Sequence, residues 1–376
     1  MSDVRKLELL AGQAAFDLSC ACGLEPSRRR AAGERWVVPI ALPDGRRLRT
    51  LKVLLDNRCP NDCVYCAQRA AAGGRRAHFR PEELARLTAE MVRAGRVEAL
   101  FLSSGLGPDP VRTMDSMLAA VEILRRRHHH RGFIHLKVLP GAQRAQIERG
   151  AQLAQRLSIN LEVPAQRYMR ALSRRKDLDG DIRQRLAWIA AAVADPRSRA
   201  RGHTTQFVVG AAGERDRDIV RAAGALYRDQ GLSRAYYSKF QPLADTPLAQ
   251  QAPVPFMREH RLYQADFLLR CYGFAAEEIP FGPGGDLDLE QDPKARWAAL
   301  HPERFPLEVN RAAPAALLRV PGLGPTAVRR IVAARRRERL RRPEELARLG
   351  VRLRAAAGHL LLEGRLASSW GQQRLF

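Results

Sequence analysis

Short apolar runs recur along residues 50–240 and are separated by amphipathic segments. The runs are 50–56, 97–102, 133–139, 157–163, 204–209 and 234–240. Segments between them, such as 81–93 and 114–126, carry apolar residues at helical spacing. Strands that alternate with helices are typical of a parallel sheet covered by helices. The pattern therefore predicts an α/β fold with six strands.

The fourth of these runs has one polar face. Ser158, Asn160 and Glu162 alternate with apolar residues between 157 and 163. In a strand this alternation places the three polar side chains on the same side. Polar groups that point into a barrel need partners, which a bound ligand would supply. A water-filled barrel mouth is the alternative interpretation.

Three cysteines lie within eight residues directly after the first run. Cys59, Cys63 and Cys66 have the spacing C-x3-C-x2-C. Three thiolates can hold three irons of a [4Fe–4S] cluster and leave the fourth iron open to a small molecule. Structural zinc is the alternative, but it needs a fourth ligand, and the candidate, His78, lies twelve residues further on.

Composition and charge limit the class of protein. The 376 residues are 45% hydrophobic, which allows one barrel-sized domain and a small second one. No run of eighteen apolar residues and no secretory signal pattern occurs, so we expect a cytoplasmic protein without a membrane partner. Six cysteines are too few for a disulfide scaffold, and we interpret Cys20, Cys22 and Cys271 as structural.

The formal net charge is +24. Such a field favours a polyanionic partner, for which nucleic acid is the natural candidate. The cations are mostly arginines spread over the whole chain, so a biased genomic base composition is an alternative explanation.

Towards the C-terminus the alternation of strands and helices ends in a Gly/Pro-rich, acidic stretch. This composition predicts a linker. A helix, the segment Val320-Pro-Gly-Leu-Gly324 and a second helix follow, and a degenerate copy comes after them at 343–352. We expect an N-terminal extension at 1–46, a barrel at 47–285, a linker at 286–311 and a small all-α module at 312–376.

The C-terminal pattern resembles the helix-hairpin-helix motif. Gly322 and Gly324 would let backbone N–H groups bind a phosphate at the start of the second helix, and Arg329 and Arg330 would add charge. Such contacts bind DNA through its backbone without reading the sequence. A packing or protein-interaction role is the alternative.

The cysteine spacing, with Tyr65 just before the last cysteine, resembles the signature of the radical S-adenosylmethionine (SAM) superfamily. The resemblance implies a partial (β/α)6 barrel of the TIM type and a [4Fe–4S] cluster on Cys59, Cys63 and Cys66. It also implies that SAM binds the open iron and yields a 5′-deoxyadenosyl radical. An electron donor such as flavodoxin or ferredoxin would supply the electron.

The same resemblance implies further cofactor-binding residues. Ser103, Ser104 and Gly105 stand where the superfamily often has a Gly-Gly-Glu sequence that holds the methionine end of SAM, although the acidic residue is missing here. An ordinary strand-to-helix turn is the alternative. Asn160 and Glu162 match positions that contact the ribose and methionine parts of SAM. Tyr65 is the last residue that we expect to bind the cofactor.

Over nearly its full length the chain resembles a family of radical SAM proteins assigned to DNA modification or repair. Matching stretches include LKVLLDNRCPNDCVYCAQR, ALFLSSGL and LSINLEVPA. The resemblance implies an enzyme that acts on DNA beside a uracil-DNA-glycosylase-like protein. Two alternatives are a radical SAM enzyme that modifies RNA and a DNA-binding scaffold with a structural or redox-sensing cluster.

Overall fold

The structure is a computed structural model, and it describes residues 3–14, 36–41 and 45–366. The chain divides into two compact units. The first unit comprises residues 1–214 and 225–259, and the second comprises 215–224 and 260–376. Residues 260–311, which the sequence predicts as the end of the barrel and a linker, therefore cluster with the C-terminal helices.

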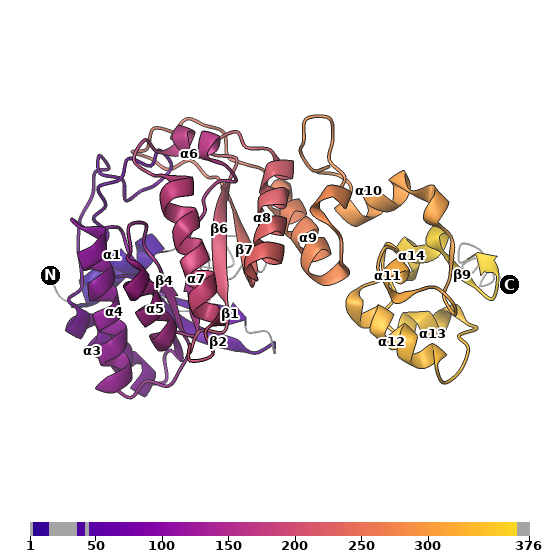
Figure 1. The fold of residues 1–376 in the computed structure, drawn as a ribbon, viewed down its shortest axis with the longest axis horizontal. Helices are drawn as coiled ribbons and strands as arrows, with labels where there is room; N and C mark the ends of the chain where they lie inside the picture. Colours follow the sequence, from indigo (N-terminus) through magenta and orange to yellow (C-terminus); the bar gives the residue numbers. More distant parts are fainter. Residues whose placement is uncertain (1–2, 15–35, 42–44, 367–376) are drawn as a thin grey trace. The chain divides into compact units, whose positions relative to one another are not determined.

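A seven-stranded sheet forms the centre of the first unit, in the order β1-β2-β3-β4-β5-β6-β7 (Figure 1). Strand β1 is antiparallel to β2, and β2 to β7 are all parallel. The sheet curls into a half-barrel, which confirms the α/β fold with six parallel strands. The strands are β1 Val37–Ala41, β2 Arg47–Leu54, β3 Ala99–Ser103, β4 Ile134–Lys137, β5 Arg156–Ser158, β6 His203–Val209 and β7 Arg234–Lys239.

Helices α3, α4, α5 and α7 lie next to one another along the sheet (Figure 1). Helix α4 begins four residues before the predicted position, because Asp109 caps it by accepting hydrogen bonds from the backbone N–H groups of Val111 and Arg112. The helical segments of this part of the chain are α1 Asp3–Gln13, α3 Pro81–Arg93, α4 Pro110–Arg126, α5 Arg144–Leu153, α6 Gln166–Leu172, the π-helix η2 Leu178–Arg183 and α7 Gln184–Ala194.

The predicted strand 157–163 is wrong in its second half, since β5 ends at Ser158. The hydroxyl of Thr205 on β6 donates to Ile159 O at 2.8 Å and accepts from Leu161 N at 3.0 Å, so a side chain replaces the backbone ladder there. Glu162 then adopts a left-handed φ of 68°. Backbone pairing with β6 resumes at Glu162, whose N–H donates to Gln206 O at 2.9 Å and whose carbonyl accepts from Val208 N at 2.8 Å.

Helices α8 (Asp216–Gln230) and α9 (Phe256–Tyr272) contribute residues to both units. The other elements of the second unit are η3 Ala276–Glu278, α10 Pro293–Leu300, η4 Pro302–Arg304, β8 Leu307–Glu308, α11 Pro314–Leu317, α12 Pro325–Arg335, α13 Pro343–Arg348, α14 Leu353–Ala356, η5 Ala357–His359, β9 Leu360–Leu362 and β10 Arg365–Leu366.

The expectation of an all-α C-terminal module is wrong, because β8, β9 and β10 form a small sheet. Leu360 and Leu362 are buried in the local core, so the apolar run 360–362 is a strand rather than the continuation of a helix. Glu363 and Gly364 both have positive φ and make the tight turn between β9 and β10. Among the described residues no helix is both long and apolar enough to cross a membrane.

Candidate active site

The loop that carries the three cysteines directly follows β2. Cys63 is buried, with 5% of its surface exposed, whereas Cys59 and Cys66 are partly exposed, and none of the three is in a disulfide. Burial raises the pKa of Cys63, and burial together with the neighbouring thiolates raises that of Cys66 to about 12. Without a metal, Cys63 and Cys66 therefore favour the protonated form, and iron binding would have to displace their protons.

This donor set fits a cluster. The backbone N–H of Gln68 donates to Cys66 Sγ at 3.4 Å, a contact of the kind that tunes cluster thiolates. Among the described residues, no group of three His, Cys, Asp or Glu side chains converges on one metal ion. A [4Fe–4S] cluster does not need such convergence, because each thiolate binds a different iron. His78 is exposed and pairs through its backbone with Asp56.

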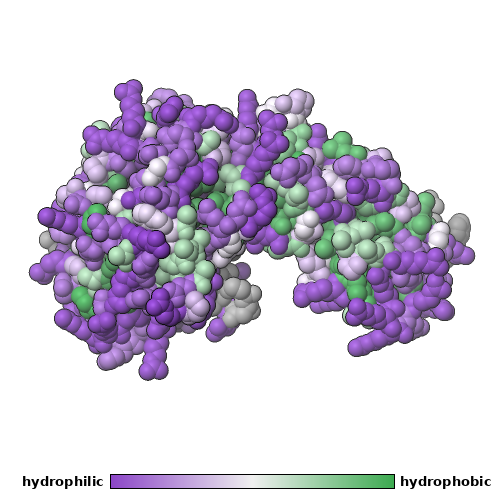
Figure 2. All heavy atoms as spheres, viewed as in Figure 1, coloured by the Kyte–Doolittle hydropathy of each residue, from purple (hydrophilic) through white to green (hydrophobic). Residues whose placement is uncertain are grey.

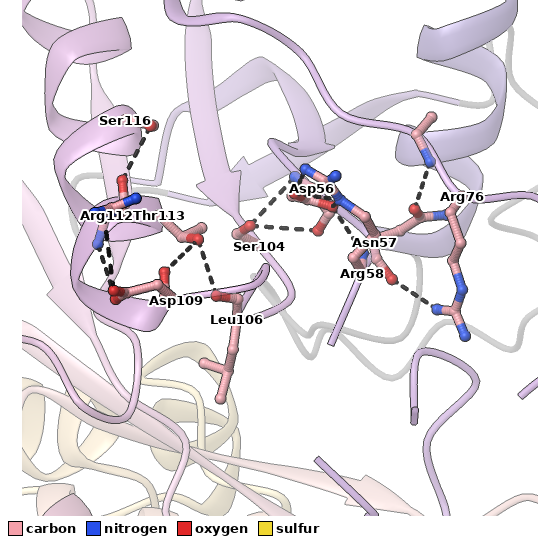
Figure 3. A network of polar contacts seen from close by, with 11 residues as sticks. Asp56, Asn57, Arg58, Arg76, Ser104, Leu106, Asp109, Arg112, Thr113 and Ser116 are labelled. Atoms are coloured by element: carbon pink, nitrogen blue, oxygen red, sulfur yellow. Dashed lines mark hydrogen bonds and ion pairs between the residues drawn. The ribbon is translucent and has the colours of Figure 1, made fainter. Parts of the chain in front are cut away.

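Contacts between the ends of β2 and β3 fix the start of this loop, among them those of the Ser104 hydroxyl with the Asp56 backbone (Figure 3). Gly105 N donates to Asp56 O at 2.6 Å, and Gly107 N donates to Arg58 O at 2.9 Å. A Cβ atom on Gly105 would lie only 2.4 Å from Arg58 O, so the close approach requires glycine here. Ser104 Oγ accepts from Asp56 N at 3.2 Å.

Two of the predicted cofactor residues thus hold the cysteine loop in place. The hydroxyl of Ser104 is used by Asp56, and Gly105 provides the space that the loop needs. Ser103 is buried, with 1% of its surface exposed, at the end of β3. Their contact with SAM remains a prediction.

Asn57 and Arg76 hold the rest of the loop. Asn57 is fully buried and binds Gln13, Arg75 O and Ala77 N through its side-chain amide. The guanidinium of Arg76 donates to four carbonyl oxygens at 2.8–3.1 Å, namely those of Asn57, Gln68, Arg69 and Ala72. No sequence pattern indicates either role, because the partners are mostly backbone groups that only the folded loop places together.

The segment after α6 supports the other side of the cysteine loop. Ser173 Oγ donates to Asp62 Oδ1 at 2.5 Å, and Arg174 N donates to Asp62 Oδ2 at 3.1 Å. The backbone N–H of Val64 donates to Leu172 O at 2.9 Å. The loop is therefore held between β3 and the chain that follows β5.

Glu162 and Lys176 form a buried ion pair beside the cysteines. Lys176 Nζ lies 3.0 Å from Glu162 Oε1, and the two side chains are 10% and 7% exposed. Burial opposes the charge of Lys176, but negative charge on Cys63, when it is ionised, and on Glu162 outweighs this effect and raises the lysine pKa. Lys176 thus supplies a positive charge that would offset the negative charge of the three thiolates that hold a cluster.

Tyr65 and Asn160 lie next to this ion pair. Burial, followed by the charge of Glu162, raises the pKa of Tyr65 well above its ordinary value, so the phenol stays protonated. Asn160 Nδ2 donates a long hydrogen bond of 3.5 Å to Glu162 Oε2. The structure therefore brings Tyr65, Asn160, Glu162 and the cysteines together. It adds Lys176, a charged residue that no motif in the sequence indicates.

The predicted nucleic-acid residues lie in the second unit. Gly324 is the N-cap of α12, and Arg329 and Arg330 are exposed on that helix. Gly322 has a φ of +81°, and a Cβ atom there would lie 2.7 Å from Arg352 O. Gly322 is therefore needed for packing between the segment 320–324 and the one that precedes α14, besides any contact with phosphate.

Helices α9 and α10 pack against the same segment. Lys294 Nζ donates to Leu323 O at 2.5 Å and lies 4.5 Å from the centre of the Tyr272 ring. Burial lowers the pKa of Lys294 to about 7. Arg319 pairs with Glu278 at 2.9 Å, and its guanidinium lies 3.6 Å from the centre of the Phe274 ring.

Residues 53–226 match the family model described as the Radical SAM superfamily. The chain therefore contains the domain of a radical SAM enzyme, a class that uses a [4Fe–4S] cluster and SAM. With both groups bound, such a site supplies radical chemistry initiated by one electron, and the residues described above hold the cysteine loop and balance its charge. No curated protein matches the chain.

Several solved structures are similar in fold. The FeFe-hydrogenase maturase HydG from Carboxydothermus hydrogenoformans has 14% identity and a TM-score of 0.47, over 57% of this chain and 50% of that one. Methylornithine synthase (PylB) has 15% identity and a TM-score of 0.47, over 57% and 60%. The methyltransferase TsrM from Kitasatospora setae has 13% identity and a TM-score of 0.41, over 52% and 38%. The chain thus spans about half the length of HydG.

Arg76→Met should weaken the hold on the cysteine loop, because four carbonyl oxygens lose a charged donor. We expect the reconstituted cluster to lose iron to a chelator roughly tenfold faster or more. Visible absorbance under anaerobic conditions measures this rate. Arg75→Met is the matched control, since the Arg75 side chain is exposed. Equal rates for the two variants would show that Arg76 does not support the cluster.

Glu162→Gln should weaken SAM binding by about 1–3 kcal/mol while iron is retained, because the change removes a buried negative charge and replaces one acceptor oxygen by an NH2 donor at nearly the same volume. Anaerobic calorimetry measures the affinity. The double variant Glu162→Gln, Lys176→Met removes the unpaired lysine as well. We expect its affinity for SAM to remain as low as that of the single variant. Recovery of the original affinity in the double variant would mean that Glu162 only neutralises Lys176.

Proposed function

We propose that this chain is a radical SAM enzyme that acts on DNA in repair or modification, with the second unit binding the duplex. The observation that carries the proposal is the combination of two features in one chain. The first unit holds three free cysteines of radical SAM spacing, and the second has a glycine-containing turn followed by a helix with exposed arginines.

Helix α12 suits a phosphate contact. Gly324 caps it without a side chain, Pro325 follows, and the first turn contains no acidic residue. Its N-terminal N–H groups and the helix dipole favour an anion. Arg329 and Arg330 lie one turn further on and form no ion pair with any described residue. In this proposal the turn and α12 are a helix-hairpin-helix that positions DNA by its backbone.

Point substitutions test the proposal better than removal of the C-terminus. Val309 belongs to the core of the C-terminal helices, and Lys294 and Arg319 join the turn region to α9, η3 and α10. A cut near residue 311 would break these contacts. The exposed arginines of α12 can be changed without touching that core.

Arg329→Gln with Arg330→Gln should lower the affinity for duplex DNA and reduce the slope of log K against log salt by roughly 2, because two phosphate contacts are lost. Fluorescence anisotropy over a salt series measures both values, with duplex RNA of the same sequence as the comparison. Arg93→Gln with Arg131→Gln removes the same charge from exposed positions elsewhere and should leave the slope unchanged. An unchanged slope in the α12 variant would contradict the assignment, and equal binding of duplex RNA would favour an RNA substrate.

A further inference from the structure

A basic cavity lies beside the cysteine loop in the first unit. It has a volume of about 490 Å³ and is formed by α6 and the chain between α6 and η2. The residues that matter here are Arg170, Ser173, Arg174, Arg175, Lys176 and Asp177. This size is in the range of sites that hold small molecules or single nucleotide units. The surface over α6 is mostly hydrophilic in Figure 2.

The cavity contains positive charges that no carboxylate of the described residues neutralises. Lys176 is already paired with Glu162, and Asp177 Oδ1 accepts from the backbone N–H groups of Asp179 and Gly180. Arg170, Arg174 and Arg175 are exposed, and none of them forms an ion pair with a carboxylate of the described residues. Guanidinium groups match phosphate oxygens in geometry and charge. The cavity is therefore suited to an anion with phosphate chemistry.

The wall of this cavity is joined to the cysteine loop. Arg175 Nη1 donates to Pro60 O at 3.1 Å, and Ser173 and Arg174 N both donate to Asp62. On its inner side the wall continues into Lys176, which binds Glu162. A ligand held by these arginines would therefore lie next to the cysteine loop.

We propose that Arg170, Arg174 and Arg175 bind the phosphodiester backbone of the nucleic-acid strand and hold the target nucleotide next to the reaction site. The inference rests on the proposed function and names a second contact with the substrate, apart from α12. An acidic electron-donor protein would also meet positive charge here. A partner protein needs about 800 Å² of matching surface, however, whereas a strand needs only a cavity that admits phosphates.

The variant Arg170→Gln, Arg174→Gln tests the proposal in the full chain. Neither side chain bonds the cysteine loop, so iron content and the visible spectrum should stay as in the unchanged protein. The affinity for a labelled single-stranded DNA of mixed sequence should fall. The slope of log K against log salt should shrink by about 1.4, since two contacts are lost from a single strand. The control Arg93→Gln, Arg131→Gln should keep the original slope.

Three results would overturn the inference. The slope and affinity could be unchanged in the Arg170, Arg174 variant while substitution of the α12 arginines still weakens duplex binding. This result would reject the role of the cavity but not the proposed function. Unchanged DNA binding with slower reduction by flavodoxin, but not by dithionite, would assign the cavity to a protein donor. If the unchanged protein binds neither single-stranded nor duplex DNA, the proposed function fails and this inference fails with it.

Discussion

The hydrogen bond from Gly105 N to Asp56 O is the contact on which the site depends, because it fixes the cysteine loop to the end of the sheet. A free loop would have to lose its conformational entropy when a cluster binds. Arg76 and the Asp62–Ser173 contact hold the same loop at two further places. The three thiols are therefore placed by contacts that reach three different parts of the first unit.

Charge is the second constraint on the site. A cluster brings three thiolates into a region where burial already raises the pKa of Cys63 and Cys66. Lys176 offsets that charge, and Glu162 pairs with Lys176. Breaking a buried pair by removing one partner leaves an uncompensated charge, which is costly. The residues beside the cysteines thus act as one electrostatic group, which explains why Glu162 cannot be assigned to cofactor binding alone.

Periodicity and spacing were enough to predict the six parallel strands and the cysteine loop, because both signals are local in the sequence. The break in β5 was not predictable, since it depends on the hydroxyl of Thr205 in the next strand of the sheet. Arg76 was missed because it binds backbone carbonyls, for which no residue pattern exists. The roles of Ser104 and Gly105 at the β2–β3 junction likewise depend on how closely two loops approach.

The proposed function joins radical SAM chemistry to DNA in one chain. Formation of 5′-deoxyadenosine from SAM by the reconstituted full chain under anaerobic reduction, measured with and without DNA, tests it most directly. We expect a slow uncoupled reaction without DNA and a clear stimulation by DNA, and we expect both to be absent when Cys63 is changed to Ala. Equal formation of 5′-deoxyadenosine with and without DNA, or none from a cluster-loaded protein under either condition, would rule this function out.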